Sequence, residues 1–528
     1  MNSGERTVDK AGDVSSAFTV FAFLFAWAQL FDYSAAVATI FDFSTNYYDI
    51  DYCFTVAICL TAVWVILNPS SLYRSIFLFV FVIVGTIIRM PISPNHVVFE
   101  VIVLISILTC FVYMKLKEKS SFTKTKFYEA FAPVVRLEVI VLYFWAAIHK
   151  INTGFFDKDI SCATIQLFNV KDVLPIMPTP DWFISINPFL TLLTESSIPI
   201  LLIIPKTRIL GLIIAIIFHF ILGFVYTGFT ILVYSFLSLF IPASSYDRIK
   251  PNFKQLTYKL SKILSKFSNY KDWKKTRFDN FITQLIFLIS IFFLMGFFMR
   301  GNTEKFYLLS EEGLYIIFFF VFLIAFFYFV IRGLKEFRIE QRITLVPEMK
   351  WLLIFPILVL VNGSLPHLGV KNIQSMAMFS NLRTEGGKTN HLFIPSFFQS
   401  SNNLEDLVTI KGANLRELNK FSGFSSRRPL RGTSVTLPRS YVKHMENNDK
   451  DYRERFEYKV PFVLLQNLVT GLAKEGQKDI KLEYERDGEI LYTRNAEVDP
   501  VLSKASIFQR KFISQRAVPD DDRGLCMW

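Results

Sequence analysis

The stretch Arg136–Lys150, RLEVIVLYFWAAIHK, decides the fold class of this chain, and the sequence INTGFF follows it. It is predicted to belong to a membrane helix, yet it contains Arg136 and Glu138 and ends on His149 and Lys150. A charge placed in hydrocarbon costs roughly 2.5–3.5 kcal/mol on insertion scales, so a charged residue inside a span indicates function by default. The segment is therefore both a predicted span and a candidate site.

Residues at helical spacing give this predicted helix one continuous face. Arg136, Ile140, Tyr143, Ala147 and Lys150 follow one another at alternating steps of four and three, so their side chains line up. A line with polar ends would run from a lysine at the outer edge, past Tyr143, to a buried arginine.

The composition extends this interpretation to the whole chain. Of 528 residues, 52% are hydrophobic, 19% are charged and 57 are phenylalanine, which predicts a polytopic membrane protein and excludes a single soluble core. The net charge of +12 is densest in loops between apolar segments, so it indicates membrane topology and no nucleic-acid partner. Five cysteines without paired spacing predict neither a metal site nor a disulfide framework.

About eleven apolar segments approach the roughly 20 residues that a bilayer requires. Basic loops at residues 115–126, 248–277 and 332–350 predict a cytoplasmic N-terminus and place Lys150 and the chain after about Leu365 on the exoplasmic side. The basic amphipathic stretch 254–267 predicts a helix on the inner leaflet. The predicted spans centre near Leu24, Leu60, Val80, Leu104, Leu142, Ser196, Ile216, Tyr234, Ile289, Phe320 and Leu358.

The tail changes composition sharply. We expect an all-α polytopic bundle over residues 1–366, followed by a small α+β or β-rich exoplasmic domain over residues 367–528. Alternation on both sides of an Asp-Gly pair predicts a hairpin at Asp479–Arg494. Helical spacing after a proline predicts a helix at Pro461–Ala473, and HLFIPSF and SVTLP are predicted as strands.

Two further ionisable residues lie within predicted spans, Glu195 and His219. At about 1.5 Å per residue, both fall near mid-bilayer, as Arg136 does. An Arg136–Glu195 pair is therefore geometrically feasible, with His219 as a neighbour. The alternative is a structural ion pair that fixes helix register, together with a histidine that is satisfied within the core.

Lys150 has two interpretations. Lysines at helix ends commonly extend into lipid headgroups. Against this, Lys150 follows Ala146, Ala147 and His149 at an outward end, where the positive-inside rule disfavours cations. In an apolar pocket its amine would become a usable base. The sharper hypothesis is a desolvated lysine that deprotonates a substrate delivered from the outer leaflet.

The stretch Ser380–Pro395, SNLRTEGGKTNHLFIP, crowds polar residues around two glycines at the predicted exit from the membrane. It is either a polar turn that caps the bundle or a binding loop over the outer mouth near Lys150. In the second case Arg383 is the carboxylate partner, and Asn390 and His391 are further substrate-binding candidates.

Residues 136–152 resemble the Arg…Tyr…Ala…Lys-(Leu/Ile)-Asn/Asp signature of the horizontally transferred transmembrane domain, the membrane core of vitamin K-dependent gamma-carboxylase and its relatives. LTLLTESSIPILLIIPKTRILG with His219, and LPHLGVKNIQSMAMFSNLRTEGG, are similar to later family segments. Asn381 stands where the carboxylase has tryptophan. The resemblance covers roughly residues 130–240 and 365–390.

The resemblance implies an exoplasmic or lumenal active site in which Lys150 acts as base toward reduced vitamin K or a related quinol. Carbon dioxide and oxygen would be co-substrates, and glutamate side chains of a peptide or protein would be carboxylated. The tail is shorter than that of the animal enzyme, and the loop after Lys150 lacks histidine. His149 and His219 are further catalytic candidates, and Tyr143, Arg136 and Glu195 are cofactor-binding candidates.

Two other function classes remain open at this stage. The first is a transporter or a lipid- or quinone-binding protein that uses Arg136, Glu195 and His219 as a polar pathway. The absence of detectable internal repeats weighs against it. The second is a structural or sensing protein whose tail binds a partner. In every case we expect membrane lipids as partners.

Overall fold

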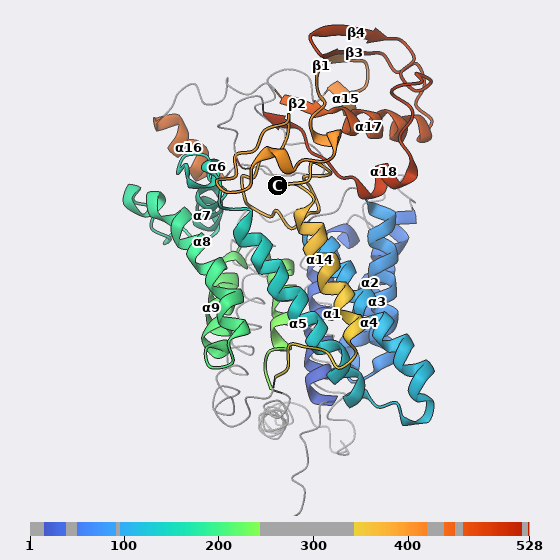
Figure 1. Ribbon diagram of the computed structural model, residues 1–528, viewed down its shortest axis with the longest axis vertical. Coiled ribbons are helices and arrows are strands. Elements are labelled where there is room, and N and C mark those ends of the chain that lie inside the picture. The colour runs from blue at the N-terminus through green and yellow to red at the C-terminus, as the bar shows by residue number, and fades with distance from the viewer. Residues whose placement is uncertain are drawn as a thin grey trace, which may run out of the picture. The chain divides into compact units, whose positions relative to one another are not determined.

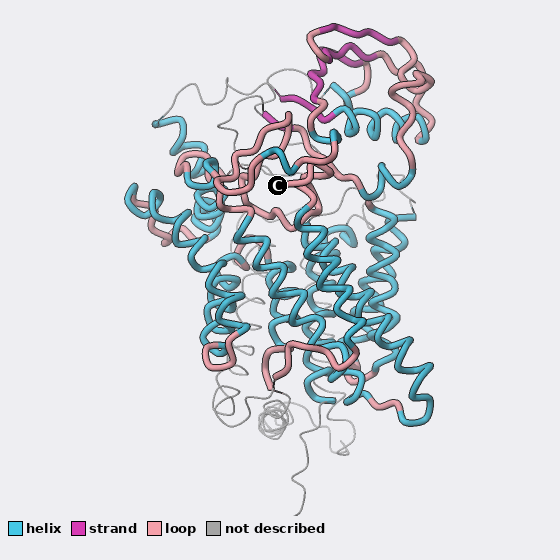
Figure 2. Tube along the Cα trace, viewed as in Figure 1, coloured by secondary structure: helices cyan, strands magenta, loops and turns pink. Residues whose placement is uncertain are grey.

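The computed structural model describes residues 15–38, 50–90, 95–242, 343–419, 438–448, 458–519 and 526. The described chain is mostly helical and carries one antiparallel sheet (Figures 1 and 2). Its contacts divide it into two compact units. The first holds residues 1–85, 104–137 and 205–353, and the second holds residues 86–103, 138–204 and 354–528.

Five helical segments of the described residues are long and apolar enough to cross a membrane, which supports a multi-pass integral membrane protein. They are Ser16–Tyr33, Leu72–Arg89, Asn95–Ser121, Lys124–Ile148 and Asp181–Ile203. The corresponding helices are α1 (Ser15–Ala38), α3 (Leu72–Arg89), α4 (Asn95–Glu118), α5 (Lys124–Ile148) and α8 (Asp181–Ile203).

The prediction of about eleven spans is not supported. Apolar segments near Ile216, Tyr234 and Leu358 form the shorter helices α9 (Arg208–Leu222), α10 (Thr227–Ser238) and α14 (Ile354–Ser364). At about 1.5 Å per residue, the 15 residues of α9 cover only roughly 22 Å. The segment near Leu60 forms α2 (Ile50–Leu67). The predicted spans near Ile289 and Phe320, and the amphipathic stretch 254–267, lie outside the described residues.

Aromatic packing holds the first unit together. Helix α1 packs against α2 and α10, and α9 packs against α10. The ring of Phe21 on α1 lies within 6.4 Å of the rings of Phe25, Phe79, Phe131 and Phe236. The many phenylalanines of this chain therefore serve here as core residues that join helices distant in sequence.

The second unit places short helices beyond the end of α5. They are α6 (Thr153–Phe156) and α7 (Cys162–Val173), and α7 packs against α8 and against α16 (Arg439–Asn448) of the tail. A buried cluster that includes Phe155, Phe168, Ile184 and Tyr441 joins these elements. The tail therefore shares a compact unit with residues 138–204, and the predicted boundary at residue 366 stays a prediction.

The sheet of the tail has the strand order β4-β3-β1-β2-β5, and all its pairings are antiparallel. Helix α17 (Phe462–Lys474) follows β2 and contributes Phe462, Leu465 and Val469 to the core of the tail. This confirms an α+β tail. The strands are β1 (Leu407–Ala413), β2 (Tyr458–Pro461), β3 (Leu482–Arg486), β4 (Glu489–Thr493) and β5 (Val518–Pro519); the short helices are α15 (Arg416–Asn419) and α18 (Ile507–Phe512).

The predicted hairpin is confirmed. Strands β3 and β4 are joined by Asp487 and Gly488 alone, with φ angles of 53° and 82°. A two-residue loop with both residues at positive φ is the turn that Asp-Gly favours. The predicted helix at Pro461–Ala473 is also confirmed, because α17 begins directly after its N-cap Pro461.

The prediction of a strand at HLFIPSF is wrong. Only His391 forms a β-bridge, an isolated one with Asn152. The backbone then turns, because Nδ1 of His391 accepts hydrogen bonds from the amides of Phe393 and Ile394. This local bonding competes with a strand ladder. Residues 434–437 of the predicted strand SVTLP lie outside the described residues.

Candidate functional site

Lys150 lies in the turn that joins α5 to α6. The last turn of α5 tightens, with the amide of Lys150 bonded to the carbonyl of Ala147 at 3.1 Å. Asn152 then starts α6 as its N-cap, and its side chain accepts a hydrogen bond from the amide of Phe155. The end of α5 and the N-cap Asn152, two residues after the lysine, therefore fix the backbone position of Lys150.

The amine of Lys150 is buried, as the hypothesis of a desolvated lysine requires; the residue is only 2% exposed. Its Nζ lies 2.6 Å from Oε2 of Glu195, and it donates to the carbonyls of Met378 at 3.1 Å and Ala146 at 3.2 Å. An ammonium group has three protons. Three acceptors therefore surround it.

Glu195 comes from α8 and is buried. We predicted that it could pair with Arg136; in the structure its ion pair is with Lys150. Arg136 belongs to the first unit, where it donates to the carbonyls of Leu239 at 2.7 Å and Thr344 at 2.8 Å. The estimated depth in the membrane suggested Arg136 as the partner of Glu195. Depth alone does not show which side chains pack beside Glu195, and the partner is Lys150.

The loop that supplies the Met378 carbonyl has an unusual backbone. Gln374, Met376, Phe379 and Asn381 all have positive φ angles, between 49° and 62°. Such angles are uncommon for residues other than glycine and cost on the order of 1–3 kcal/mol where the surroundings enforce them. They often occur at ligand-binding and catalytic sites. The strain is located here beside the amine.

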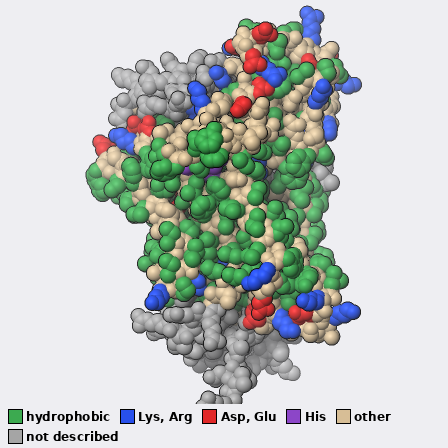
Figure 3. All heavy atoms as spheres, viewed as in Figure 1, with side chains coloured by type: hydrophobic (Ala, Val, Ile, Leu, Met, Phe, Trp, Pro, Cys, Tyr) green, Lys and Arg blue, Asp and Glu red, His purple; other side chains and the backbone are tan. Residues whose placement is uncertain are grey.

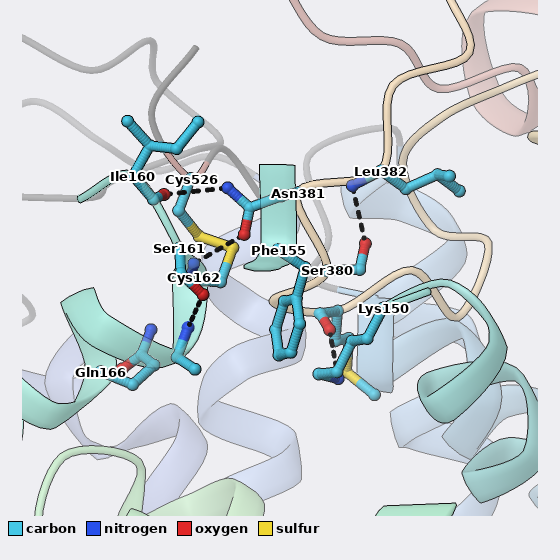
Figure 4. Close-up of a disulfide and its surroundings, with 12 residues drawn as sticks. Lys150, Phe155, Ile160, Ser161, Cys162, Gln166, Ser380, Asn381, Leu382 and Cys526 are labelled. Carbon is cyan, nitrogen blue, oxygen red and sulfur yellow. Dashed lines mark hydrogen bonds between the residues drawn. A yellow bond between two sulfur atoms is a disulfide. The ribbon is translucent and has the colours of Figure 1, made fainter. Parts of the chain in front are cut away.

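Three asparagines bind this loop to the segment after Lys150, and Figure 4 shows one of them, Asn381. Asn152 donates to the carbonyl of Ser380 at 2.6 Å, and Asn390 donates to Oδ1 of Asn152 at 3.2 Å. Asn381 accepts from the amide of Cys162 at 2.6 Å and donates to the carbonyl of Ile160. Asn381 therefore links the strained loop directly to the segment after Lys150.

A disulfide joins Cys162 to Cys526 beside these bonds, across 364 residues of sequence (Figure 4). From the scattered cysteines we expected no disulfide framework, and this one bond was not foreseen. Spacing along the sequence could not reveal a pair this far apart. Disulfides persist in oxidising compartments.

We expect Cys526→Ser to lower the free energy of unfolding by about 2–5 kcal/mol, because the disulfide closes a very long loop. Thermal unfolding of the purified protein with and without reductant measures this. Cys53→Ser is the matched control, since Cys53 is a free, exposed thiol. Equal melting temperatures of the two variants would contradict the expectation.

Three histidines form a cluster next to Lys150. The ring of His367 lies 5.2 Å from that of His149 and 5.1 Å from that of His391, and Trp145 stacks on His149 at 5.0 Å. Nε2 of His149 faces the carbonyl of Gly363 at 2.9 Å, and Nε2 of His391 faces that of Ile148 at 3.0 Å. The rings of Trp145, His149, His367 and His391 therefore form one buried wall of rings.

His367 differs from its neighbours in this wall. It is 6% exposed, and neither ring nitrogen has a hydrogen-bond partner among the residues that the structure describes. Burial and, to a smaller extent, the nearby His391 lower the pKa of His367 to about 4. The ring is therefore neutral near pH 7, with one donor and one acceptor nitrogen unfilled.

Gly363 on α14 permits this packing. A Cβ atom at this position would lie 2.2 Å from Cδ1 of the Trp145 indole. Any larger residue would push α14 away from α5 or displace the indole. In the described part of the chain, no group of three His, Cys, Asp or Glu side chains has the geometry to hold a metal ion.

The remaining predicted site residues are divided between the two units. Tyr143 is buried on the same helix, seven residues before Lys150. Arg383 is half-buried, and its amide donates to Oδ1 of Asn390. His219 lies in the first unit with its ring next to Phe218 and Phe229.

Sequence reasoning missed two members of the site, His367 and Met378. His367 carried a signal, since it follows Leu-Pro directly after the last predicted span. Met378 contributes only its backbone, which a side-chain pattern cannot indicate.

Comparison with known proteins adds no identification, because no family model, no curated protein and no solved structure matches this chain.

Proposed function

We propose that the chain is a multi-pass membrane enzyme in which Lys150 removes a proton from a weakly acidic, lipid-soluble substrate of the quinol type. The observation that carries this proposal is the buried contact between Lys150 and Glu195. Burying an ion pair costs several kcal/mol per ion. A chain that needed only a packed helix end could place an apolar residue at either position.

The pair can act as a base because its members can share one proton. When the proton is on the Glu195 carboxyl group, the Lys150 amine is neutral and donates its two protons to the carbonyls of Met378 and Ala146. The substrate hydroxyl proton then goes to the nitrogen lone pair on the side of Glu195, and the product ammonium is bonded to the two carbonyls and to the substrate oxyanion. Acceptors fixed before the reaction stabilise developing charge without reorganisation.

The wall of rings suits a flat, partly apolar substrate. Trp145, His149 and His367 offer aromatic faces, which stack on other rings. The two unfilled nitrogens of His367 can donate to and accept from a substrate hydroxyl group. We assign His367 the role of orienting the substrate toward Lys150.

We further propose that this site faces the exoplasmic side, with the N-terminus in the cytoplasm. The Cys162–Cys526 disulfide supports this side, since such bonds persist in oxidising compartments. The loops rich in lysine and arginine support it independently. Coupling to carbon dioxide and to carboxylation of a glutamate side chain rests on the family resemblance alone.

A transporter that uses Arg136, Glu195 and His219 as one polar path is less well supported. Glu195 forms its ion pair with Lys150, and Arg136 and His219 belong to the other compact unit.

The test uses the full-length protein in detergent with reduced vitamin K as the probe. Binding should raise the free energy of unfolding by about 2.7 kcal/mol at a concentration 100 times Kd. His367→Phe keeps an aromatic ring but removes both nitrogens, so we expect it to reduce this stabilisation, while His444→Phe, in α16, should not. Equal stabilisation of both variants would remove His367 from the site, and no stabilisation of the wild-type protein would overturn the quinol proposal.

A second arm separates chemistry from binding. Radiolabelled bicarbonate and a glutamate-containing peptide are added with the reduced quinone and oxygen. Incorporation of label would support carboxylation, and oxygen uptake without incorporation would support oxidation of the quinol only. Stabilisation without either reaction would instead indicate a quinone-binding protein.

A further inference from the structure

A loop of the tail exposes large apolar side chains. No charged residue occurs between Lys388 and Glu405. Within this stretch Phe393 is 77% exposed and Phe397 is 76% exposed. Leu392 and Phe398 are also exposed, and the rings of Phe397 and Phe398 lie 4.3 Å apart. Several large apolar side chains exposed in one loop mark an interaction surface.

This loop starts at the end of a membrane span. The amide of Leu392 donates to the carbonyl of Ile151 at 3.0 Å, and Nε2 of His391 lies 3.0 Å from the carbonyl of Ile148. Ile148 is the last residue of α5, which is long and apolar enough to cross a bilayer. The loop therefore leaves the protein at the level where α5 leaves the hydrocarbon.

A second apolar patch is also hydrogen-bonded near the C-terminal end of a candidate span. On α18, Ile507, Phe508 and Phe512 are exposed, and the rings of Phe508 and Phe512 lie 5.2 Å apart. Lys511 of α18 donates to the carbonyl of Ile88, near the C-terminal end of α3. Helix α3 is also long and apolar enough to cross a bilayer.

Both attachments lie on the same side of the membrane. Helices α3, α4 and α5 follow one another in the chain, and each is a candidate span. If α3 crosses in one direction, α4 returns and α5 crosses again. The C-terminal ends of α3 and α5 therefore share one leaflet, and so do the two patches that are bonded to them.

We propose that these two patches form an interfacial collar that inserts into the boundary between headgroups and acyl chains of that leaflet. Aromatic residues favour this depth, and the adjacent Arg510 and Lys511 suit lipid phosphates. Figure 3 shows hydrophobic side chains reaching the loops at the base of the tail, while charged side chains gather toward its sheet. The collar consists of Leu392, Phe393, Phe397, Phe398, Ile507, Phe508 and Phe512.

Lipid explains the collar better than a second copy of the chain. Each patch is bonded near the C-terminal end of a candidate span, and aromatic side chains at the end of a span favour the lipid interface. The tail would then be held at the membrane surface rather than extending freely from it. This inference concerns the tail alone and does not depend on the proposed chemistry at Lys150.

Fluorescence quenching tests the collar in the full-length protein reconstituted in vesicles of phosphatidylcholine and phosphatidylglycerol. The free cysteines Cys53, Cys59 and Cys110 are first replaced by alanine, while the disulfide keeps the other two unreactive. A bimane dye is then attached at Phe397→Cys or Phe508→Cys.

The matched control is Tyr492→Cys on β4, which is also an exposed aromatic position of the tail but lies at the far edge of the sheet (Figure 1). Nitroxide-labelled lipids should quench the dye roughly threefold more strongly at positions 397 and 508 than at position 492, and aqueous iodide should show the reverse order.

Two outcomes would overturn the proposal. Iodide quenching at positions 397 and 508 as strong as at position 492 would place the patches in water. Shielding from both quenchers that disappears when the protein is diluted with lipid would identify a second copy of the chain as the occupant. Size-exclusion elution and a disulfide that remains oxidised verify that each labelled variant is folded.

Discussion

Lys150→Arg is expected to abolish turnover of the quinol while the protein stays folded. Arginine keeps a positive charge for Glu195, but its guanidinium group does not lose a proton at any accessible pH. General acid–base catalysis typically contributes 10²–10⁴-fold. We therefore expect a loss of turnover on the order of 10³-fold.

Lys150→Met gives an independent version of the same test, because methionine has a similar length but no lone pair on nitrogen. Oxygen uptake in the presence of reduced vitamin K measures turnover for both variants. Lys158→Met is the matched control, since Lys158 is an exposed lysine in the same segment. Retained turnover in folded Lys150→Arg and Lys150→Met proteins would show that this lysine has a structural role only.

Both variants also distinguish catalysis from fold maintenance. The arginine variant keeps a cation beside Glu195 and so should unfold at nearly the same temperature as the wild-type protein. If the arginine variant instead melts early and loses activity in proportion, packing explains the loss. Reduced vitamin K should still stabilise the arginine variant, because the wall around His367 is unchanged.

The membrane character and the position of the buried amine could be predicted from the sequence, because both depend on local composition. The charged residues within the apolar run 136–150 can be recognised from that segment alone. The Asp487–Gly488 pair predicts the β3–β4 hairpin in the same local way. The partner of Lys150 could not be predicted. Arg136 lies within α5 and Lys150 just after its end, and the sequence does not show which of them packs beside Glu195.

The rest of the site depends on long-range contacts. Met378 acts through a backbone carbonyl whose position depends on a strained loop. The sequence SMAMFS contains no Gly, Asn or Asp, the residue types that would predict a positive φ angle. Cys162 and Cys526 are joined across 364 residues, more than two thirds of the chain. The predicted number of spans failed for a related reason, since apolar content does not distinguish a short helix such as α9 from a full span.

Glu195→Gln is expected to lower the free energy of unfolding by about 3–5 kcal/mol, because it leaves the buried Lys150 ammonium without its counter-charge. Glu118→Gln is the matched control. Glu118 pairs with Lys126 at 3.3 Å, but that pair is partly exposed, and such pairs contribute about 0–1 kcal/mol. Thermal unfolding in detergent compares the two variants.

The double variant Lys150→Met Glu195→Met should recover most of this loss, since well-packed apolar residues often replace a buried ion pair at no cost in stability. It should nevertheless have no turnover, because no base remains. A stable but inactive double variant would therefore show that the pair is kept for its chemistry. A double variant that unfolds as readily as Glu195→Gln would show that the two residues do not interact energetically, and the proposed base would lose its partner.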